Sequence, residues 1–311
     1  MSTSPAHRLI SLLPGATELL CALGLGDQLV GVSHECDFPP AVNHLPRVSA
    51  TAIHHQADSL AIDAQVRAAL AAGAPLYQLD LAQLRALSPS MLISQSLCAV
   101  CGVDSDTVSA ALCAVPDAAT QFNFAPARLD EFFEAVTALG ALLGVPARAD
   151  ALRDALQARV DAVGRRSASL DCARPRVAFL EWLAPLFTGG HWNPELVALA
   201  GGHALFGEVG RKSTVIDWDT LAASDPEVLF IACCGFSTPR TLAELPSLTA
   251  QPGWSALRAV RDGRVYVSDG NAYFNRPGPR LVDSLEILAH ALHPAAHPLP
   301  AGLPAAVRVT R

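Results

Sequence analysis

The stretch Arg8-Leu-Ile-Ser-Leu-Leu-Pro-Gly-Ala-Thr-Glu18 carries the pattern that decides the fold. The apolar run Arg8–Leu13 predicts a buried strand, Pro14-Gly15 predicts a turn, and Thr17–Leu25 predicts a helix. We expect Glu18 in the first turn of that helix, where a carboxylate suits the helix dipole. A strand that passes through a short turn into a helix is the repeating unit of α/β proteins.

The same alternation of strands and helices recurs in both halves of the chain. The apolar runs that predict further strands are Leu29–Ser33, Met91–Ser94, Thr120–Phe124, Val177–Glu181, Val228–Ala232 and Val265–Ser268. Residues 129–168 instead place apolar side chains at helical spacing, without a strand signal. We therefore predict an α/β fold of two Rossmann-like lobes, residues 8–128 and 172–293, joined by a long helical connector over residues 129–168. The Pro- and Ala-rich residues 294–311 predict a loosely packed tail.

The composition is that of a folded protein that is too long for one ordinary core. The chain has 311 residues, of which 51% are hydrophobic and 16% are charged, as in buried globular domains and unlike disordered segments. Its formal net charge is −7 and it contains no block of Lys or Arg, which argues against nucleic acid as a partner. The apolar run Leu9–Leu25 contains Pro14 and Glu18, so we expect no membrane insertion.

The first residues lead to an expected compartment. An export signal has a basic region followed by an apolar stretch. Residues 1–7 do not show this pattern. We therefore expect a cytoplasmic protein, and a periplasmic one only if the N-terminus is truncated. In the cytoplasm the 8 cysteines are expected to be reduced.

Two clusters of reactive side chains follow two of the predicted strands. His34-Glu35-Cys36-Asp37 follows the second strand, and Cys98-Ala-Val-Cys101 comes shortly after the third. Ligands bind at the carboxyl ends of the strands in open α/β sheets, so both clusters fall at the expected place. Two thiolates at this spacing can chelate one metal ion or form a redox pair, and His34, Cys36 or His191 would complete the ligand set. The alternative is that Cys98 and Cys101 are small buried apolar residues.

A second group of candidates begins where the first strand of the C-terminal lobe ends. Glu181-Trp182 is followed after a short loop by Gly189-Gly190-His191-Trp192. The tryptophan rings offer broad apolar faces and the imidazole offers a directed hydrogen bond, a combination that suits a flat, partly polar ligand. The alternative is that Trp182 and Trp192 pack in the core or at a hinge.

The loop after the last predicted strand, Asn271-Ala-Tyr-Phe-Asn-Arg-Pro-Gly-Pro-Arg280, contains a third group. Tyr273 and Phe274 are candidates for stacking on a ligand, and Arg276 for pairing with a carboxylate or phosphate. The alternative is a capping loop in which the prolines set the entry of the final helix. We expect Arg280 to be a solvated residue of the first turn of that helix.

Sequence motifs of several enzyme classes are absent from the chain. It contains no glycine-rich phosphate-binding loop of the usual spacings, no Gly-x-Ser-x-Gly and no His-Glu-x-x-His. A nucleophilic pair of Cys98 with His34 stays open as an alternative, because the sequence alone does not bring the two together.

Three stretches together resemble the vitamin B12 and iron-siderophore binding proteins of ABC importers. They are Arg8–Glu18, Leu23-Gly-Leu-Gly-Asp-Gln-Leu-Val-Gly31 and Pro252-Gly-Trp-Ser-Ala-Leu-Arg-Ala-Val-Arg-Asp-Gly-Arg-Val-Tyr266. The resemblance covers residues 8–293. It implies a fold of the class III periplasmic-binding-protein type, with little hinge closure, and no catalysis.

The resemblance also implies a cobalamin-like corrinoid or another metal chelate, held between the lobes. The residues that would contact it are Trp182, Trp192, Tyr273 and Phe274 by flat apolar contact, His34 or His191 by binding the metal or ring amides, and Glu35, Asp37 and Glu181 by accepting hydrogen bonds from amides. An ABC importer permease is implied as a partner, and Glu18 and Glu195 are the acidic residues to consider for docking.

The elements His34–Asp37, Cys98/Cys101 and His191-Trp192 are not general features of those importer proteins, and they look like the mark of a cytosolic cobalamin-binding subgroup. The ligand would then be stored, delivered or sensed inside the cell. Two alternatives belong to other classes. One is a thiol–metal protein that binds zinc through Cys98, Cys101 and His34 or Cys36, and the other is an interaction module that has lost its small ligand.

Overall fold

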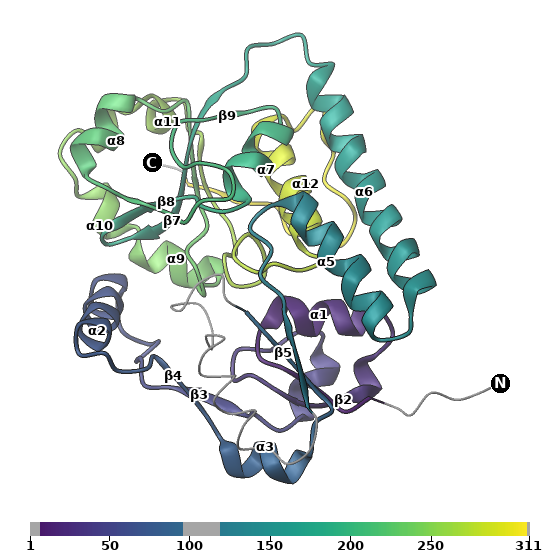
Figure 1. The fold of residues 1–311 in the computed structure, drawn as a ribbon. Coiled ribbons are helices and arrows are strands. Elements are labelled where there is room, and N and C mark those ends of the chain that lie inside the picture. The colour runs from purple at the N-terminus through teal and green to yellow at the C-terminus, as the bar shows by residue number, and fades with distance from the viewer. Residues whose placement is uncertain (1–6, 96–118, 310–311) are drawn as a thin grey trace.

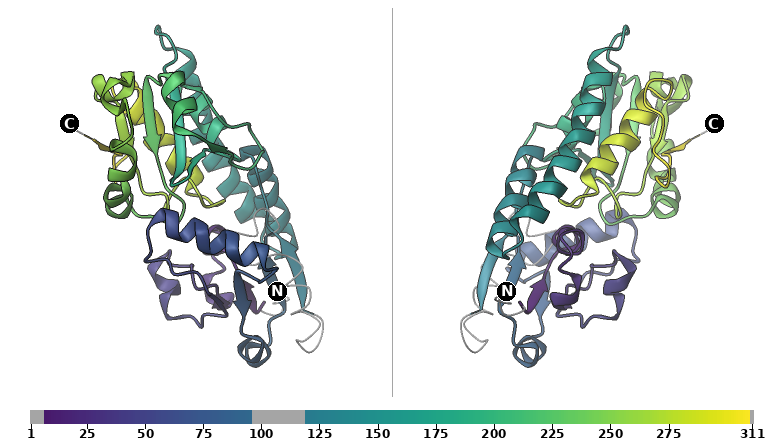
Figure 2. Two further views of the ribbon diagram at one scale, coloured as in Figure 1. Left: turned by 90° about the vertical axis from the view of Figure 1, so that its left-hand side faces the viewer. Right: turned by 90° about the vertical axis from the view of Figure 1, so that its right-hand side faces the viewer.

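The computed structural model describes residues 7–95 and 119–309 (Figure 1). Two α/β lobes lie end to end, and two long helices, α5 (Leu129–Leu142) and α6 (Pro146–Ala168), run along one side of the molecule (Figures 1 and 2). This is the two-lobed α/β architecture that the sequence predicts. Within the described residues, no helix combines the length and the apolar character needed to cross a membrane.

The N-terminal lobe is built on a parallel sheet with the strand order β2-β1-β5-β6. Its strands are β1 (Leu9–Ser11), β2 (Leu29–Val32), β5 (Met91–Ser94) and β6 (Thr120–Asn123). Its helices are α1 (Pro14–Ala22), α2 (Ser59–Ala71) and α3 (Leu81–Leu87), with 3-10 turns at Gly26–Gln28 and Pro40–His44. Leu9, Ile10, Leu92 and Ile93 have no exposed surface, so apolar burial on both faces holds the sheet. A short antiparallel ribbon of β3 (Ser49–Thr51) and β4 (Tyr77–Leu79) lies outside it.

The C-terminal lobe has a mixed sheet with the strand order β10-β8-β7-β11-β12-β13, and β9 pairs with β7. Its strands are β7 (Arg176–Leu183), β8 (Leu186–Thr188), β9 (His203–Ala204), β10 (Val215–Ile216), β11 (Val228–Ile231), β12 (Val265–Val267) and β13 (Val307–Arg308). Its helices are α7 (Asn193–Leu199), α8 (Trp218–Ser224), α9 (Thr238–Glu244), α10 (Pro246–Thr249), α11 (Arg258–Arg261) and α12 (Leu281–Leu292), with a 3-10 turn at Trp254–Ala256. The parallel centre, β7-β11-β12, is flanked by antiparallel strands.

The two long helices form an antiparallel pair that contacts both lobes. Phe132, Val136 and Leu139 lie on one face of α5 and are fully buried, which confirms the helical periodicity. The other helix, α6, packs against α7 and α12 of the C-terminal lobe. At its other end Arg148 donates to the carbonyl oxygen of Leu23 in the N-terminal lobe at 3.3 Å.

Two local expectations are corrected. The first helix begins at Pro14, so Glu18 lies beyond its first turn and is only 4% exposed. The C-terminal tail is packed rather than loose, because β13 pairs with β12 and His297, which is 3% exposed, lies 3.1 Å from the Ser167 hydroxyl of α6. The tail lacks an apolar periodicity of its own, and its anchors are supplied by residues far away in the sequence.

Candidate functional site

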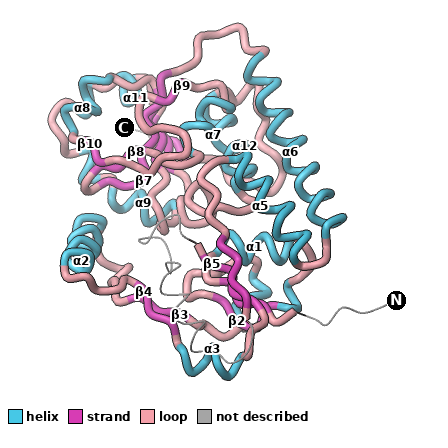
Figure 3. Tube along the Cα trace, viewed as in Figure 1, coloured by secondary structure: helices cyan, strands magenta, loops and turns pink. Residues whose placement is uncertain are grey.

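The carboxyl ends of the parallel strands in the two lobes face each other, and mostly loops, drawn in pink in Figure 3, lie at this junction. In the N-terminal lobe Gly15 follows β1 and Asp37 follows β2, and in the C-terminal lobe Asn271 and Arg276 follow β12. These residues contact the opposite lobe. Because ligands of α/β proteins bind at this edge of the sheet, the lobe interface is the candidate site.

The closest approach of the two backbones requires glycine. A Cβ atom on Gly15 would lie 2.1 Å from the carbonyl oxygen of Pro277, and a Cβ atom on Gly278 would lie 2.9 Å from the Cα atom of Gly15. Any side chain at Gly15 would force the two loops apart. Gly15 therefore lies in the first turn of α1 and at the same time allows the lobes to meet.

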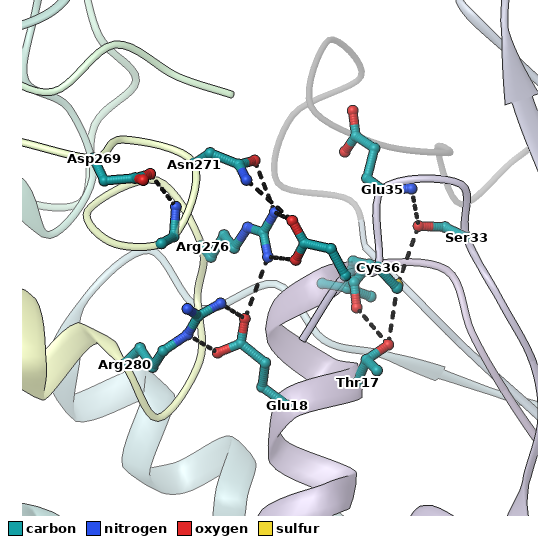
Figure 4. A network of polar contacts seen from close by, with 12 residues as sticks. Thr17, Glu18, Ser33, Glu35, Cys36, Asp269, Asn271, Arg276 and Arg280 are labelled. Atoms are coloured by element: carbon teal, nitrogen blue, oxygen red, sulfur yellow. Dashed lines mark hydrogen bonds and ion pairs between the residues drawn. The ribbon is translucent and has the colours of Figure 1, made fainter. Parts of the chain in front are cut away.

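Two arginines and two carboxylates form a buried ion cluster across the interface (Figure 4). Arg280 donates from Nε and Nη2 to the two Glu18 oxygens at 2.8 and 2.6 Å. The Nη1 atom of Arg276 lies 2.5 Å from Asp37 Oδ1 and 3.5 Å from Glu18 Oε1. Asn271 donates to Asp37 Oδ2 at 3.1 Å and accepts from Arg276 Nη2 at 2.8 Å. The Arg276 and Glu18 side chains are 8% and 3% exposed, so these charges are stabilised by each other rather than by water.

The protonation states match the pairing. Burial would raise the pKa of Asp37, but the hydrogen bond and charge of Arg276, with Asn271 and Arg280, outweigh it and hold the pKa below its usual range. Burial also opposes the charge of Arg276, yet the Asp37 carboxylate keeps the pKa of Arg276 above its ordinary value. Both partners are therefore charged at neutral pH, and the contact joins the lobes as an ion pair.

A second contact between the lobes lies at the N-terminus of α2. The backbone N–H and the hydroxyl of Ser59 donate to Glu244 Oε2 of α9 at 3.2 and 2.9 Å. Arg240, one turn earlier in α9, donates to the carbonyl oxygen of Ala57. Trp182 Nε1 donates to the carbonyl oxygen of Ser59 at 3.2 Å, which places the predicted Trp182 at the interface.

His34 and Glu35 follow β2 and come just before Asp37 of the ion cluster. The His34 ring is 6.3 Å from the ring of His55, whose carbonyl oxygen accepts a hydrogen bond from Arg240 at 3.5 Å. Three residues after His34, Asp37 belongs to the ion cluster. The Glu35 carboxylate points away from that cluster (Figure 4). The imidazole and the carboxyl group therefore border the region between the lobes without belonging to either contact.

Burial changes the charge of both side chains. It raises the pKa of Glu35 to about 7, while the positive charge of Arg276 opposes this rise. It lowers the pKa of His34 to about 4, and the charges of His55 and Arg47 add to the effect. At neutral pH the imidazole is neutral, and the carboxyl group is able to donate or to accept a hydrogen bond.

The predicted roles of two arginines are corrected. Arg276, expected to pair with a carboxylate or phosphate of the ligand, pairs with Asp37 and Glu18 of its own chain. Arg280, expected to be solvated, is 14% exposed and pairs with Glu18. Asp37, expected to accept hydrogen bonds from ligand amides, accepts them from Arg276 and Asn271. Its side chain is 50% exposed, so its contact with a ligand stays a prediction. Acids and bases of the two lobes neutralise each other here because the strand ends that carry them face each other.

The two acidic residues considered for permease docking have internal partners. The Glu18 side chain is 3% exposed within the ion cluster. Glu195 Oε2 accepts a hydrogen bond from the backbone N–H of Leu129 at 3.1 Å, so it satisfies a free donor at the start of α5. Glu18 is thus buried within the fold, whereas Glu195 is partly exposed, and its docking role stays a prediction.

Trp192 and Phe274 belong to the core of the C-terminal lobe. They are 3% and 0% exposed, and Trp192 Nε1 donates to the carbonyl oxygen of Phe274 at 2.6 Å. The rings of Phe179 and Phe230 lie 5.5 and 5.1 Å from that of Phe274. The expectation that Trp192 and Phe274 stack on a ligand is corrected, because other side chains already cover both rings. Tyr273 is partly buried beside Arg280, and its contact with a ligand stays a prediction.

Glu181 and His191 support the loop that precedes α7. Glu181 Oε2 accepts from the backbone N–H of Gly190 at 3.0 Å and from Asn193 Nδ2 at 3.3 Å, and burial raises the pKa of Glu181. His191 adopts a positive φ of 52°, and its ring lies 5.6 Å from that of Trp192. Glu181 therefore holds its own loop, in place of the expected ligand amides.

The predicted cysteine ligands divide into two sets. Cys36 is fully buried, its sulfur lies 3.1 Å from Thr17 Oγ1 and 3.2 Å from Ser33 Oγ, and burial raises its pKa, so it is a protonated packing thiol. Cys98 and Cys101 lie outside the described residues, and with them the proposed zinc set. Over residues 7–95 and 119–309, no group of three or more His, Cys, Asp and Glu side chains is arranged to hold a metal ion.

The sequence reasoning missed Ser59, Arg240 and Glu244, which join the lobes at α2. Each lies on a short surface helix whose pattern shows no special feature. For the ion cluster a usable signal existed, because an acidic residue follows a strand of one lobe and arginines follow a strand of the other. Opposite charges at facing strand ends indicate an interface.

Comparisons with known proteins agree with this architecture. The chain matches the family model described as periplasmic binding protein over residues 9–272. It is 26% identical over 283 residues to the vitamin B12-binding protein of Vibrio cholerae, covering 91% of this chain and 87% of that protein. It is 26% identical over 298 residues to the cobalamin-binding protein of Halobacterium salinarum, covering 93% and 70%. A solved periplasmic heme-binding protein from Pseudomonas aeruginosa matches with a TM-score of 0.71 at 25% identity, over 98% of this chain and 99% of that one.

Two α/β lobes with paired helices along one side, meeting at their strand ends, define a ligand-binding protein that is not an enzyme. The chain belongs to the periplasmic binding protein family, with the class III fold. The expectation of a cytoplasmic location is wrong, because the family and its solved relatives are periplasmic proteins. The cysteines were expected to be reduced because of a cytoplasmic location, so that expectation is withdrawn as well.

Proposed function

We propose that this chain is a substrate-binding receptor that holds a corrinoid between its lobes and delivers it to an ABC importer. The observation that carries the proposal is the position of His34 and Glu35 just after β2, beside Asp37, which pairs with Arg276 of the opposite lobe. A neutral imidazole beside a carboxyl group suits the metal and the peripheral amides of a corrinoid. Relatives named for vitamin B12 and cobalamin binding support this ligand class.

Haem is the competing ligand, because the solved relative from Pseudomonas aeruginosa is named for heme binding. Haem carries propionate carboxylates, whereas the corrin ring carries amides. The arginines of the interface are already neutralised by Asp37 and Glu18, so they offer little to a propionate. In its ionised form Glu35 would repel a propionate, and it is able to accept a hydrogen bond from an amide. The charges at the interface therefore favour the corrinoid.

Titration of the purified protein with hydroxocobalamin and with haemin tests this proposal. We expect saturable quenching of tryptophan fluorescence, because Trp182 lies at the lobe interface. We also expect hydroxocobalamin to bind more tightly than haemin. Substituting Glu35→Ala should weaken hydroxocobalamin binding by about tenfold, the effect of one lost hydrogen bond to a charged group. The exposed Glu208→Ala is the matched control. Tighter binding of haemin, or no response to either compound, would overturn the proposal.

A further inference from the structure

One imidazole nitrogen at the lobe interface is buried without a partner. Among the residues that the structure describes, the Nε2 atom of His34 has no hydrogen-bond partner. Glu35 Oε1 lies 3.9 Å from it, beyond hydrogen-bond distance. The rings of Tyr77 and His55 lie 5.5 and 6.3 Å from that of His34. A buried polar atom without a partner costs about 1–3 kcal/mol, so this nitrogen is suited to an atom that arrives with a ligand.

The other nitrogen of the same ring is held in a way that suits metal binding. His34 Nδ1 lies 2.8 Å from Ser49 Oγ, and the same oxygen accepts the backbone N–H of His34 at 3.1 Å. A hydroxyl oxygen has two acceptor lone pairs, so Ser49 is able to accept both N–H groups. When the Ser49 hydroxyl accepts both N–H groups, the ring proton is on Nδ1 and the lone pair of Nε2 is free, as in histidines that bind metals.

His191 offers the closest comparison within the chain, because its Nε2 atom is also buried without a partner. Its backbone, however, is hydrogen-bonded to Arg211 and Gly210 within the C-terminal lobe. Burial lowers its pKa, and the positive charge of Lys212 adds to that effect. The same positive charge would oppose a metal cation. His191 is therefore the matched control, and His34 is the candidate.

We propose that His34 Nε2 is the axial ligand of the metal in the chelate that binds between the lobes. The inference rests on the proposed function and adds to it the atom that contacts the metal. One protein ligand suffices, because the macrocycle fills the four equatorial positions of its metal. The nitrogen lone pair displaces one metal-bound water, which leaves as neutral water, and no proton or electron is transferred. The lowered pKa of His34 keeps its imidazole in the neutral form that this bond needs.

Aquacobinamide is the probe, since it lacks the nucleotide base of cobalamin and carries only water at its axial positions. Tryptophan fluorescence reports binding, the visible spectrum reports axial exchange, and electron paramagnetic resonance of the reduced Co(II) form reports the ligand nucleus. The parent chain should give a shifted spectrum and the triplet splitting that one nitrogen nucleus imposes. His34→Gln should lose the splitting and raise the Kd by roughly 10- to 100-fold, the range for disrupted metal sites. His191→Gln should keep the splitting.

A second variant keeps the test decisive if His34→Gln folds poorly. In His34→Gly, added free imidazole should restore the shifted spectrum, because it occupies the space that the side chain leaves. Saturable quenching of the parent with an unshifted spectrum would overturn the axial role and leave the proposed function standing. A splitting that persists in His34→Gln and disappears in His191→Gln would also overturn it. No binding of cobinamide, hydroxocobalamin or haemin would overturn both proposals.

Discussion

His297 shows how a single side chain holds the C-terminal tail. It is 3% exposed, its Nε2 atom lies 3.1 Å from Ser167 Oγ, and its carbonyl oxygen lies 2.9 Å from Nδ1 of His290. Burial lowers its pKa, and the charges of His293 and Arg166 add to the effect. The tail is therefore attached through an imidazole that must stay neutral.

This attachment predicts a pH dependence of stability. The pKa of His297 in the folded state is below its ordinary value, so the unfolded chain binds the proton more readily. The contribution of His297 is complete above the unfolded pKa and is lost as the pH falls toward the folded value. His297→Gln should therefore lose less thermal stability than the parent between pH 8 and pH 5, as measured by circular dichroism. Parallel pH profiles for the two proteins would contradict this.

At the scale of secondary structure, α2 is held mainly by the opposite lobe. Ser59 is the buried residue of this 13-residue helix, while Leu60 and Leu70 are 63% and 52% exposed. Asp58 caps the helix by accepting from the backbone N–H of Ala61 at 2.8 Å. The Ser59 N–H, another free donor of the first turn, is satisfied by Glu244 from across the interface. A carboxylate of one lobe thus stabilises the helix start of the other.

Removing this carboxylate should loosen α2 selectively. Glu244→Ala leaves the Ser59 donors unpaired, at a cost of about 1–3 kcal/mol. Hydrogen exchange should accelerate at the Ser59 amide and its neighbours in α2, while α12, which is apolar and buried, keeps its protection. Asp161→Ala on the exposed face of α6 serves as the control. Equal acceleration in α12 would show a global loss of stability and would refute the local role.

For the molecule as a whole, the ion cluster of Glu18, Asp37, Arg276 and Arg280 couples the two lobes. The pairs join residues 239 and 262 positions apart in the chain. Two positive and two negative charges balance here; Glu18, Arg276 and Arg280 are buried or nearly so, and the Asp37 side chain is 50% exposed. Its removal as a set would be tolerated far better than removal of one member, because a single deletion leaves a buried charge without its partner.

Arg276→Ala tests this coupling. The substitution leaves Asp37, whose side chain is 50% exposed, with Asn271 as its partner. We expect the free energy of unfolding to fall by about 1–3 kcal/mol, measured by urea denaturation. Small-angle scattering should also show a wider range of lobe orientations. The control is Arg258→Ala at the exposed pair with Glu227, where the expected loss is below about 1 kcal/mol. A similar loss in both variants would mean that the cluster does not couple the lobes.

Local patterns in the sequence determined the elements of the fold. The first strand, the helix that follows it, the strand Met91–Ser94 and the helical periodicity of residues 129–142 all agree with the structure. Each depends on the spacing of apolar residues within a few positions, and burial of one face is enough to select the element. The placement of His34 and Asp37 after a strand followed from the same reasoning, because strand ends are local features.

Only the tertiary structure decided which polar side chains are free. Arg276 and Asp37 are each plausible ligand contacts in the sequence, but folding brings them together across 239 positions and uses both. Trp192 and Phe274 have the composition of a stacking site, yet the core covers both rings. Whether a charge meets an opposite charge, or a ring meets another ring, depends on long-range contacts that carry no local periodicity. His34 Nε2 became a candidate ligand because folding buries this atom without a hydrogen-bond partner among the described residues.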